Sequence, residues 1–349
     1  MTTEWKTLIG CALCLALGLV LHGCDDAAVL EACDDRKVNV GFYADFVPLS
    51  YSLNNQAPTN STAYNTQRGY EADLLTAVGE LQDVELSFVR RAIPPLETDD
   101  GRTFPFAGIW LLAAEPEYDL IGGGITIRDD RTLDDDGRQV VAFTSGHVAF
   151  RQSLLVRRED ARRLADIGNL TEEDVVSVHR GTTGEERLLQ RVGIVDDEGV
   201  LVAGTRVVTP RRTLTADGSS AYTITAAMTS HELSARQRII PPAPFPQVVL
   251  HSSVEQQLQA LYDGDVDAVS RGDIGNRNEA LSSGRTLAVT APDAQAEHGG
   301  FAVDVDDADL LACLDEAIDL VTDGGRLEYT DWAANPRVFL ERAEEVNKE

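Results

Sequence analysis

Lysine is nearly absent from this sequence of 349 residues. Only Lys6, Lys37 and Lys348 occur, so almost all of the 30 basic residues are arginines. They are outnumbered by 58 acidic residues, and the formal net charge is −28. A surface with such an excess of negative charge repels nucleic acid and anionic lipid. We therefore expect no nucleic-acid partner and no electrostatic attraction to an anionic membrane surface.

Short motifs of common catalytic and cofactor sites are also missing. No glycine-rich loop ends in Gly-Lys-Ser/Thr, which excludes a phosphate-binding loop of the P-loop type. Neither GxSxG nor HExxH occurs, and the six histidines show no metal-ligand spacing. We therefore expect a protein that is not an enzyme and that has no cofactor and no metal site.

No hydrophobic run is long enough to cross a membrane as a helix. The longest covers residues 7–21, about 15 residues where roughly 20 are needed, and it follows a short polar start. This pattern is typical of a secretory signal peptide over residues 1–23. The run ends in Leu21-His22-Gly23-Cys24, which resembles a lipoprotein processing site. We expect a lipid on Cys24; plain secretion, an uncleaved anchor and a buried helix are the alternatives.

The five cysteines divide into two groups. Cys11 and Cys14 lie inside the hydrophobic run, so we assign them to the signal peptide and not to a redox motif. With Cys24 lipidated, Cys33 and Cys313 remain, and two thiols in an oxidising compartment tend to pair. A disulfide between them is our hypothesis, and two buried thiols are the alternative.

Strand patterns and helix patterns alternate along most of the chain, which predicts an α/β protein with largely parallel sheets. The expected strands are residues 37–42, 84–89, 118–122, 154–156, 175–178, 266–269 and 301–305. The expected helices are residues 70–81, 107–115, a stretch from 184 onward, a stretch around 258–262 opened by Ser253, and 310–321. The expected loops are residues 54–67 and 94–105.

Residues 194–250 do not follow this alternation. Residues 205–209 and 222–225 have the composition of two strands around a turn at 216–219, and a proline-rich stretch follows at 241–244. We interpret the whole segment as an inserted hairpin with a proline-rich return.

Three segments combine a strand end with groups that bind small ions. Residues 119–131 end a strand in three glycines, which let a backbone approach a ligand, and in arginines, which grip carboxylates. Residues 178–185 lead through Gly-Thr-Thr-Gly into a helix, whose free N–H groups attract anions. Residues 267–273 end in an acid that suits an ammonium group. Taken singly, the first segment is better explained as a tight turn, the second as an ordinary helix cap and the third as a surface loop.

Taken together and in order, these segments resemble the family-3 extracellular solute-binding proteins, the amino-acid receptors of ABC importers. The resemblance covers most of residues 37–340. It is carried by Val38-Asn39-Val40-Gly41 with Pro48, Gly69-Tyr70-Glu71-Ala72-Asp73-Leu74, Tyr118-Asp119-Leu120-Ile121 with Ile125-Thr126 and Arg131, Phe143-Thr144, Gly181-Thr182-Thr183, Asp267-Ala268-Val269, and Asp323-Gly324-Gly325 with Trp332.

The resemblance implies a two-lobed type II periplasmic-binding-protein-like fold, with a ligand cleft between the lobes and two hinge strands. The expected parts are a tether at 24–35, a first lobe at 36–150 plus 298–349, and a second lobe at 151–297 that contains the insertion. It also implies an extracytoplasmic, lipid-anchored monomer that delivers an amino acid or related small carboxylate to a membrane permease. A lipid-tethered sensor and a cyclohexadienyl-dehydratase-like enzyme are the alternatives.

The family's ligand contacts carry over to positions that match its motifs. Arg131 is expected to hold the ligand's α-carboxylate, and the carbonyl of Gly124 to accept from its ammonium group. The other expected ligand-binding residues are Thr126, Thr182, Thr183, Asp273, Arg271, Tyr43 and Phe46.

Two departures from the family pattern concern the ligand. Gly146-His147 replaces the usual Pro-Tyr, and Gly272 stands where the family's acid lies, with Asp273 one residue further on. Arg271, beside that position, favours an acidic side chain or a ligand without an amine.

Overall fold

The computed structural model describes residue 33 and residues 35–52, 67–94, 96–97, 103–104, 106–227 and 233–348. The expected signal peptide, the lipidation site at Cys24 and nearly all of the loop at 54–67 lie outside the described residues. Within them, no helix combines the length and the hydrophobicity that a membrane span requires.

The first lobe is built on a mixed sheet with the strand order β10-β19-β8-β1-β5, in which β9 also pairs with β19. Strand β1 is parallel to both β5 and β8, whereas β19 is antiparallel to β8. The strands are β1 (Arg36–Phe42), β5 (Leu86–Ala92), β8 (Leu120–Thr126), β9 (Val141–Phe143), β10 (Val148–Phe150) and β19 (Glu297–Asp304). Short strands beside this sheet are β2 (Asp45–Phe46), β3 (Ser50–Ser52), β4 (Gln67–Arg68), β6 (Leu96–Glu97) and β7 (Thr103–Phe104).

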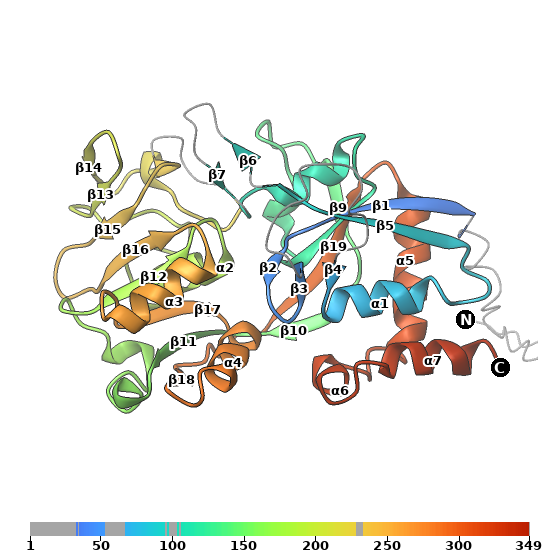
Figure 1. Ribbon diagram of the computed structural model, residues 1–349. Helices are drawn as coiled ribbons and strands as arrows, with labels where there is room; N and C mark the ends of the chain where they lie inside the picture. Colours follow the sequence, from blue (N-terminus) through green and yellow to red (C-terminus); the bar gives the residue numbers. More distant parts are fainter. Residues whose placement is uncertain are drawn as a thin grey trace, which may run out of the picture.

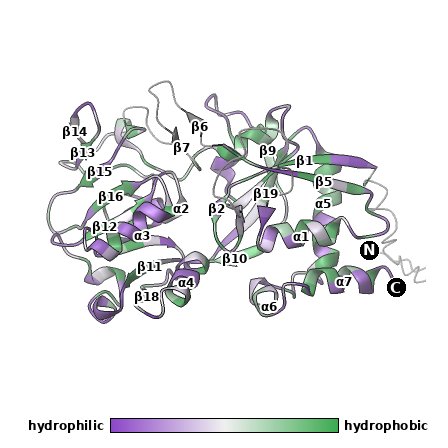
Figure 2. Ribbon diagram, in the orientation of Figure 1, coloured by the Kyte–Doolittle hydropathy of each residue, from purple (hydrophilic) through white to green (hydrophobic). Residues whose placement is uncertain are grey.

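Helices cover both faces of this sheet (Figure 1). Those on one face are α1 (Tyr70–Val78), α5 (Ala308–Val321), α6 (Tyr329–Ala334) and α7 (Val338–Val346), and the 3-10 helix on the other face is η3 (Ile109–Ala114). Because Leu310, Leu314, Ile318 and Val321 recur every three or four residues, α5 buries them all on one side. Figure 2 shows this hydrophobic colouring along α5, with hydrophilic residues along the outer loops.

The second lobe is built on a sheet with the order β14-β13-β15-β16-β12-β17-β11-β18. Its strands are β11 (Gln152–Arg157), β12 (Val175–His179), β13 (Arg206–Val208), β14 (Thr213–Thr215), β15 (Arg238–Ile240), β16 (Gln247–His251), β17 (Ala268–Gly272) and β18 (Leu287–Thr290). Its helices are α2 (Thr183–Arg191), α3 (Val254–Asp263) and α4 (Asp273–Ser282). Short 3-10 turns of the molecule are η4 (Asp129–Thr132), η5 (Arg158–Asp160), η6 (Ile167–Asn169) and η7 (Ser220–Tyr222).

The insertion extends the second sheet, but its expected hairpin is wrong. β13 pairs with β14 and with β15, while Thr223 forms only an isolated bridge with Val200. The turn between β13 and β14 closes instead at Thr209, whose hydroxyl donates to the carbonyl oxygen of Arg212 and accepts from its N–H. This local turn brings residues 213–215 opposite β13. Its loop is shorter than the one that the expected pairing requires, so the entropic cost of closing it is lower.

The chain passes twice between the lobes. It leaves the first lobe from β10 into β11 and returns from β18 into β19. Strands β10 and β19 pair antiparallel at this crossing, with Val148 opposite Gly299 and Phe150 opposite Glu297. The paired strands form the link seen between the two halves of the molecule in Figure 1.

Cys33 and Cys313 are joined by a disulfide across a sequence separation of 280 residues. It fastens the start of the described chain to α5, in the buried core beside β1 and α1.

Candidate functional site

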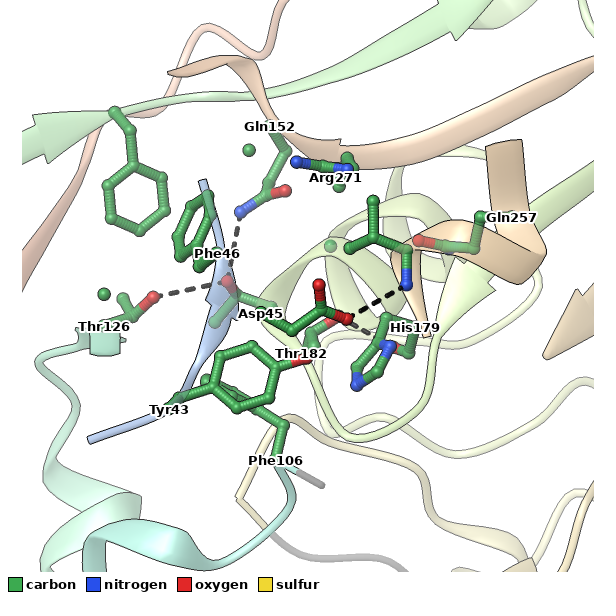
Figure 3. Close-up of a pocket in the computed structure, with 16 residues that line it drawn as sticks. Tyr43, Asp45, Phe46, Phe106, Thr126, Gln152, His179, Thr182, Gln257 and Arg271 are labelled. Atoms are coloured by element: carbon green, nitrogen blue, oxygen red, sulfur yellow. Dashed lines mark hydrogen bonds between the residues drawn. The ribbon is translucent and has the colours of Figure 1, made fainter. Parts of the chain in front are cut away.

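A cavity of about 70 Å³ lies where the two lobes meet. Its lining from the first lobe is Tyr43, Asp45, Phe46, Phe106, Gly124 and Thr126. Its lining from the hinge and the second lobe is Phe150, Gln152, His179, Thr182, Thr183, Gly184, Val254, Gln257, Arg271 and Gly272. Figure 3 shows the aromatic rings on one side of the cavity and polar side chains around the rest. A cavity of this size holds on the order of five water molecules, or a small organic molecule.

The glycines of the first segment lie inside β8, not after it as expected from the sequence. The strand continues from Leu120 to Thr126 with every residue buried. Gly124 has a positive φ of 69°, and a Cβ there would lie 2.5 Å from the ring of Phe46. Only glycine therefore allows the ring to pack on the strand. The buried Glu71 holds this backbone, because its Oε1 accepts from the N–H of Gly124 at 2.8 Å.

Side chains from both lobes and from the hinge meet in one hydrogen-bonded cluster at the edge of the cavity. Thr126 of the first lobe lies 3.3 Å from the Thr183 hydroxyl of the second. Glu297 of β19 accepts from the Thr126 hydroxyl at 3.1 Å and from the Gln152 amide at 3.2 Å. Gln152 also donates to Thr183 at 3.0 Å. These bonds hold the cleft closed at its hinge side.

Thr182 has a different task from Thr183. Its hydroxyl caps α2 by accepting from the N–H of Glu185 at 3.3 Å, and it donates to the carbonyl of His179 at 2.8 Å. This is the ordinary helix-cap alternative foreseen for the Gly-Thr-Thr-Gly segment.

Several buried polar atoms of the cavity wall have no hydrogen-bond partner among the described residues. They are Gln152 Oε1, His179 Nδ1, both amide atoms of Gln257 and Nη1 of Arg271. Burial lowers the pKa of His179 to about 4, and burial likewise lowers the pKa of Arg271. Since buried polar groups in native proteins are nearly always paired, this wall is suited to a polar ligand.

Arg131 does not line the cavity, contrary to its expected role. Its side chain is fully buried, and its guanidinium donates to the carbonyl oxygen of Ala226 from Nε at 3.3 Å and from Nη2 at 3.2 Å. Nη1 donates to the carbonyl of Thr126, and the guanidinium carbon lies 4.3 Å from the ring centroid of Trp110. Burial lowers the pKa of Arg131 to about 10. The insertion, which the sequence pattern could not place, supplies the acceptor that a ligand was expected to supply.

Asp273 also lies outside the cavity. Its carboxylate accepts from the N–H of Arg151 at 2.9 Å and forms an ion pair with Arg277 at 2.8 Å. The carboxylate in the cavity wall is that of Asp45. The remaining expected residues do line the cavity, and their roles toward a ligand stay predictions: Tyr43, Phe46, Gly124, Thr126, Thr182, Thr183 and Arg271.

Sequence reasoning missed several polar residues of the site. Asp45 follows the end of β1 by three positions, so the rule that binding residues gather at the carboxyl ends of parallel strands points to it. The others carry no local signal, because distant segments bring them together: Gln152, His179, Gln257 and Glu297.

Neither a protein-family model nor a curated protein sequence matches this chain. Solved structures do match it in fold. The arginine-, lysine- and histidine-binding protein ArtJ from Geobacillus stearothermophilus is 17% identical, with 90% of this chain and 96% of that chain covered and a TM-score of 0.52. The substrate-binding protein of an amino acid ABC transporter is 14% identical, with 90% and 100% covered and a TM-score of 0.52.

A third match is the ancestral amino acid-binding protein AncCDT-1, a precursor of cyclohexadienyl dehydratase. It is 17% identical, with 88% of this chain and 98% of that chain covered and a TM-score of 0.53. The fold is that of a type II periplasmic binding protein. In this type II fold, the cavity described above occupies the cleft between the lobes.

Proposed function

We propose that this protein is an extracytoplasmic solute-binding protein that captures an amino acid or a related small carboxylate for an ABC transporter. The observation that carries the proposal is the cavity between the lobes, in whose wall several buried polar atoms have no partner among the described residues. Three solved structures of similar fold, those of amino acid-binding or substrate-binding proteins, support it. The proposed function is reversible binding, with no catalytic step.

Direct contacts between the two lobes stabilise the closed cleft. Arg128 of the first lobe donates to Glu186 of α2 at 2.7 and 3.1 Å. Such contacts form only when the lobes are together, so a ligand that favours the closed form changes the surface presented to a membrane permease. We propose that the protein acts as a monomer in this role.

Calorimetric titration with the twenty L-amino acids and with small carboxylates tests the proposal. We expect one chemical class to bind and Gln257→Ala to weaken that binding at least tenfold, because Gln257 is fully buried in the cavity wall. Gln259→Ala is the matched control, because Gln259 lies on the same helix but is exposed and bonded to Asp263. Silence across the whole panel would refute the proposal.

The lipid anchor is a separate part of the proposal and rests on Leu21-His22-Gly23-Cys24. Cells that express the full chain and take up a labelled fatty acid should label this protein and retain it with the membranes. Cys24→Ser should remove the label and release the protein. A wild-type chain that stays unlabelled would exclude the anchor and leave the binding function untouched.

A further inference from the structure

Two opposite charges line the cavity from opposite lobes. Arg271, from β17, is 9% exposed, and its Nη1 has no hydrogen-bond partner among the described residues. Asp45, from β2, accepts only a long bond of 3.4 Å from the N–H of Val254 in the described part of the chain. Figure 3 shows both side chains at the same cavity. Neither side chain forms an ion pair with a described residue, which is costly for the buried Arg271 and less so for Asp45, which is only partly buried.

The guanidinium expected to hold a carboxylate is already occupied. Arg131 is bound by the carbonyl oxygens of Ala226 and Thr126, and one face of its guanidinium lies on Trp110. Among the described residues, Arg271 is therefore the arginine that lines the cavity.

Uncharged groups of the wall complement the two charges. The side-chain amide of Gln257 offers N–H donors, and Oε1 of Gln152 offers an acceptor, both without partners in the described residues. Aromatic rings of Phe46, Phe106 and Phe150 enclose the rest of the space. A ligand that pairs with all of these groups carries a negatively charged group and a positively charged group with N–H donors, joined by a short carbon skeleton.

We propose that Arg271 is the carboxylate anchor and Asp45 the ammonium anchor of this cavity, so that the ligand is an α-amino acid with a short side chain. This inference rests on the proposed function and specifies its ligand. The carboxylate accepts from Arg271 and the Gln257 side-chain amide, and the ammonium donates to Asp45 and Oε1 of Gln152. A zwitterion held in this way joins charges from the two lobes and stabilises the closed cleft. The volume of about 70 Å³ suits a side chain of a few atoms.

Calorimetry with three matched probes tests the two anchors separately. L-alanine has both charged groups, L-alaninamide lacks the carboxylate and propionate lacks the ammonium. Wild-type protein should bind L-alanine and bind each analogue roughly 10- to 100-fold more weakly, the range for one lost hydrogen bond to a charged group. Equal binding of L-alanine and L-alaninamide would overturn the carboxylate anchor, and equal binding of L-alanine and propionate would overturn the ammonium anchor.

Substitutions assign the anchors to residues. Arg271→Gln and Asp45→Asn should each weaken L-alanine binding roughly 10- to 100-fold. Arg277→Gln removes one positive charge from the exposed side of α4 and should leave the affinity within about twofold. Arg271→Lys keeps the charge and should lose less affinity than Arg271→Gln, which separates loss of the anchor from misfolding. Full affinity in Arg271→Gln would overturn the inference.

The remaining outcomes separate this inference from the proposed function. If wild-type protein binds only amino acids with long side chains, the proposed function stands and the inference fails. If it binds propionate but no amino acid, and Arg271→Gln abolishes that binding, the carboxylate anchor stands and the ammonium anchor fails. If wild-type protein binds none of the twenty amino acids and none of the small carboxylates, the inference and the proposed function both fail.

Discussion

The guanidinium of Arg131 and the carbonyl oxygen of Ala226 are joined by two hydrogen bonds across 95 residues of sequence. Ala226 belongs to a strap, residues 225–227, that reaches from the insertion of the second lobe to the first lobe. The N–H of Ala226 donates to Glu186, and Ala227 packs against the cluster that contains Trp110. The strap thus binds an arginine of the opposite lobe in place of a ligand.

Substitution of Arg131 should therefore affect stability more than affinity. Arg131→Leu removes the bonds to the strap, and we expect the free energy of unfolding to fall by about 1–3 kcal/mol, the range for hydrogen bonds that involve a charged group. Urea unfolding measures this change, and Arg138→Leu, at an exposed arginine, is the control. If Arg131→Leu has wild-type stability but no longer binds any carboxylate, Arg131 holds the ligand's carboxylate, as the sequence predicts.

A buried ion pair fixes the base of the insertion to α2. Arg236 donates to Glu185 from Nε at 2.7 Å and from Nη2 at 2.6 Å, and both side chains are only 1% exposed. Arg236→Met leaves the carboxylate buried without its partner, so we expect a loss of about 3–5 kcal/mol in urea unfolding. The double variant Arg236→Met/Glu185→Leu should recover much of that loss, because no uncompensated charge remains. A loss in the single variant as small as that of an exposed pair would contradict this account.

The stability of the protein should depend on pH through Glu71. Burial raises the pKa of this carboxyl from an ordinary 4.5 to about 7. Between these values the folded protein keeps a proton that the unfolded chain releases, so this contribution to stability falls as the pH rises through the window and is constant above it. The change is on the order of 3 kcal/mol.

Glu71→Gln should remove this loss of stability with rising pH, because glutamine does not titrate and its side-chain oxygen still accepts from the N–H of Gly124. Urea unfolding at about pH 5 and about pH 8 gives the comparison. Glu80→Gln makes the same exchange at an exposed position two residues after α1 and should keep the wild-type pH dependence. Identical pH dependence in wild type and Glu71→Gln would show that Glu71 is not the source.

The disulfide between Cys33 and Cys313 closes a loop of 280 residues. Cross-links over long loops restrict the unfolded chain, so Cys33→Ser should lower the free energy of unfolding by about 3–5 kcal/mol. A reducing agent should bring wild-type protein down to the same stability and leave the variant unchanged. If reductant destabilises the variant equally, the effect does not come from this bond.

Much of the architecture was predictable, because the signals are local. The spacing of Leu310, Leu314 and Ile318 predicts the buried face of α5, and this prediction is confirmed. Ser253 caps α3 by accepting from the N–H of Gln256, as its position before the helix predicts. The ordered motifs predict a two-lobed type II fold, and the solved structures of similar fold confirm it.

The binding groups of the cavity were less predictable. Tyr43, Thr126 and Thr183 reach the wall because they belong to elements that the motifs mark. Gln257 and Gln152 reach it through the packing of helices and hinge strands, and nothing in their neighbours marks them. Local sequence patterns also leave the pairing of β13 open, because any of several strand-like stretches fits its hydrophobic face.

The sequence by itself determined where most helices and strands form, because periodicity and capping act within one or two turns of chain. Tertiary structure decided which arginine is free to meet a ligand. Arg131 and Arg271 are both buried arginines, but the strap brings the carbonyl of Ala226 to Arg131, while Nη1 of Arg271 has no partner among the described residues. Because that difference depends on a segment about a hundred residues away, only the folded molecule reveals it.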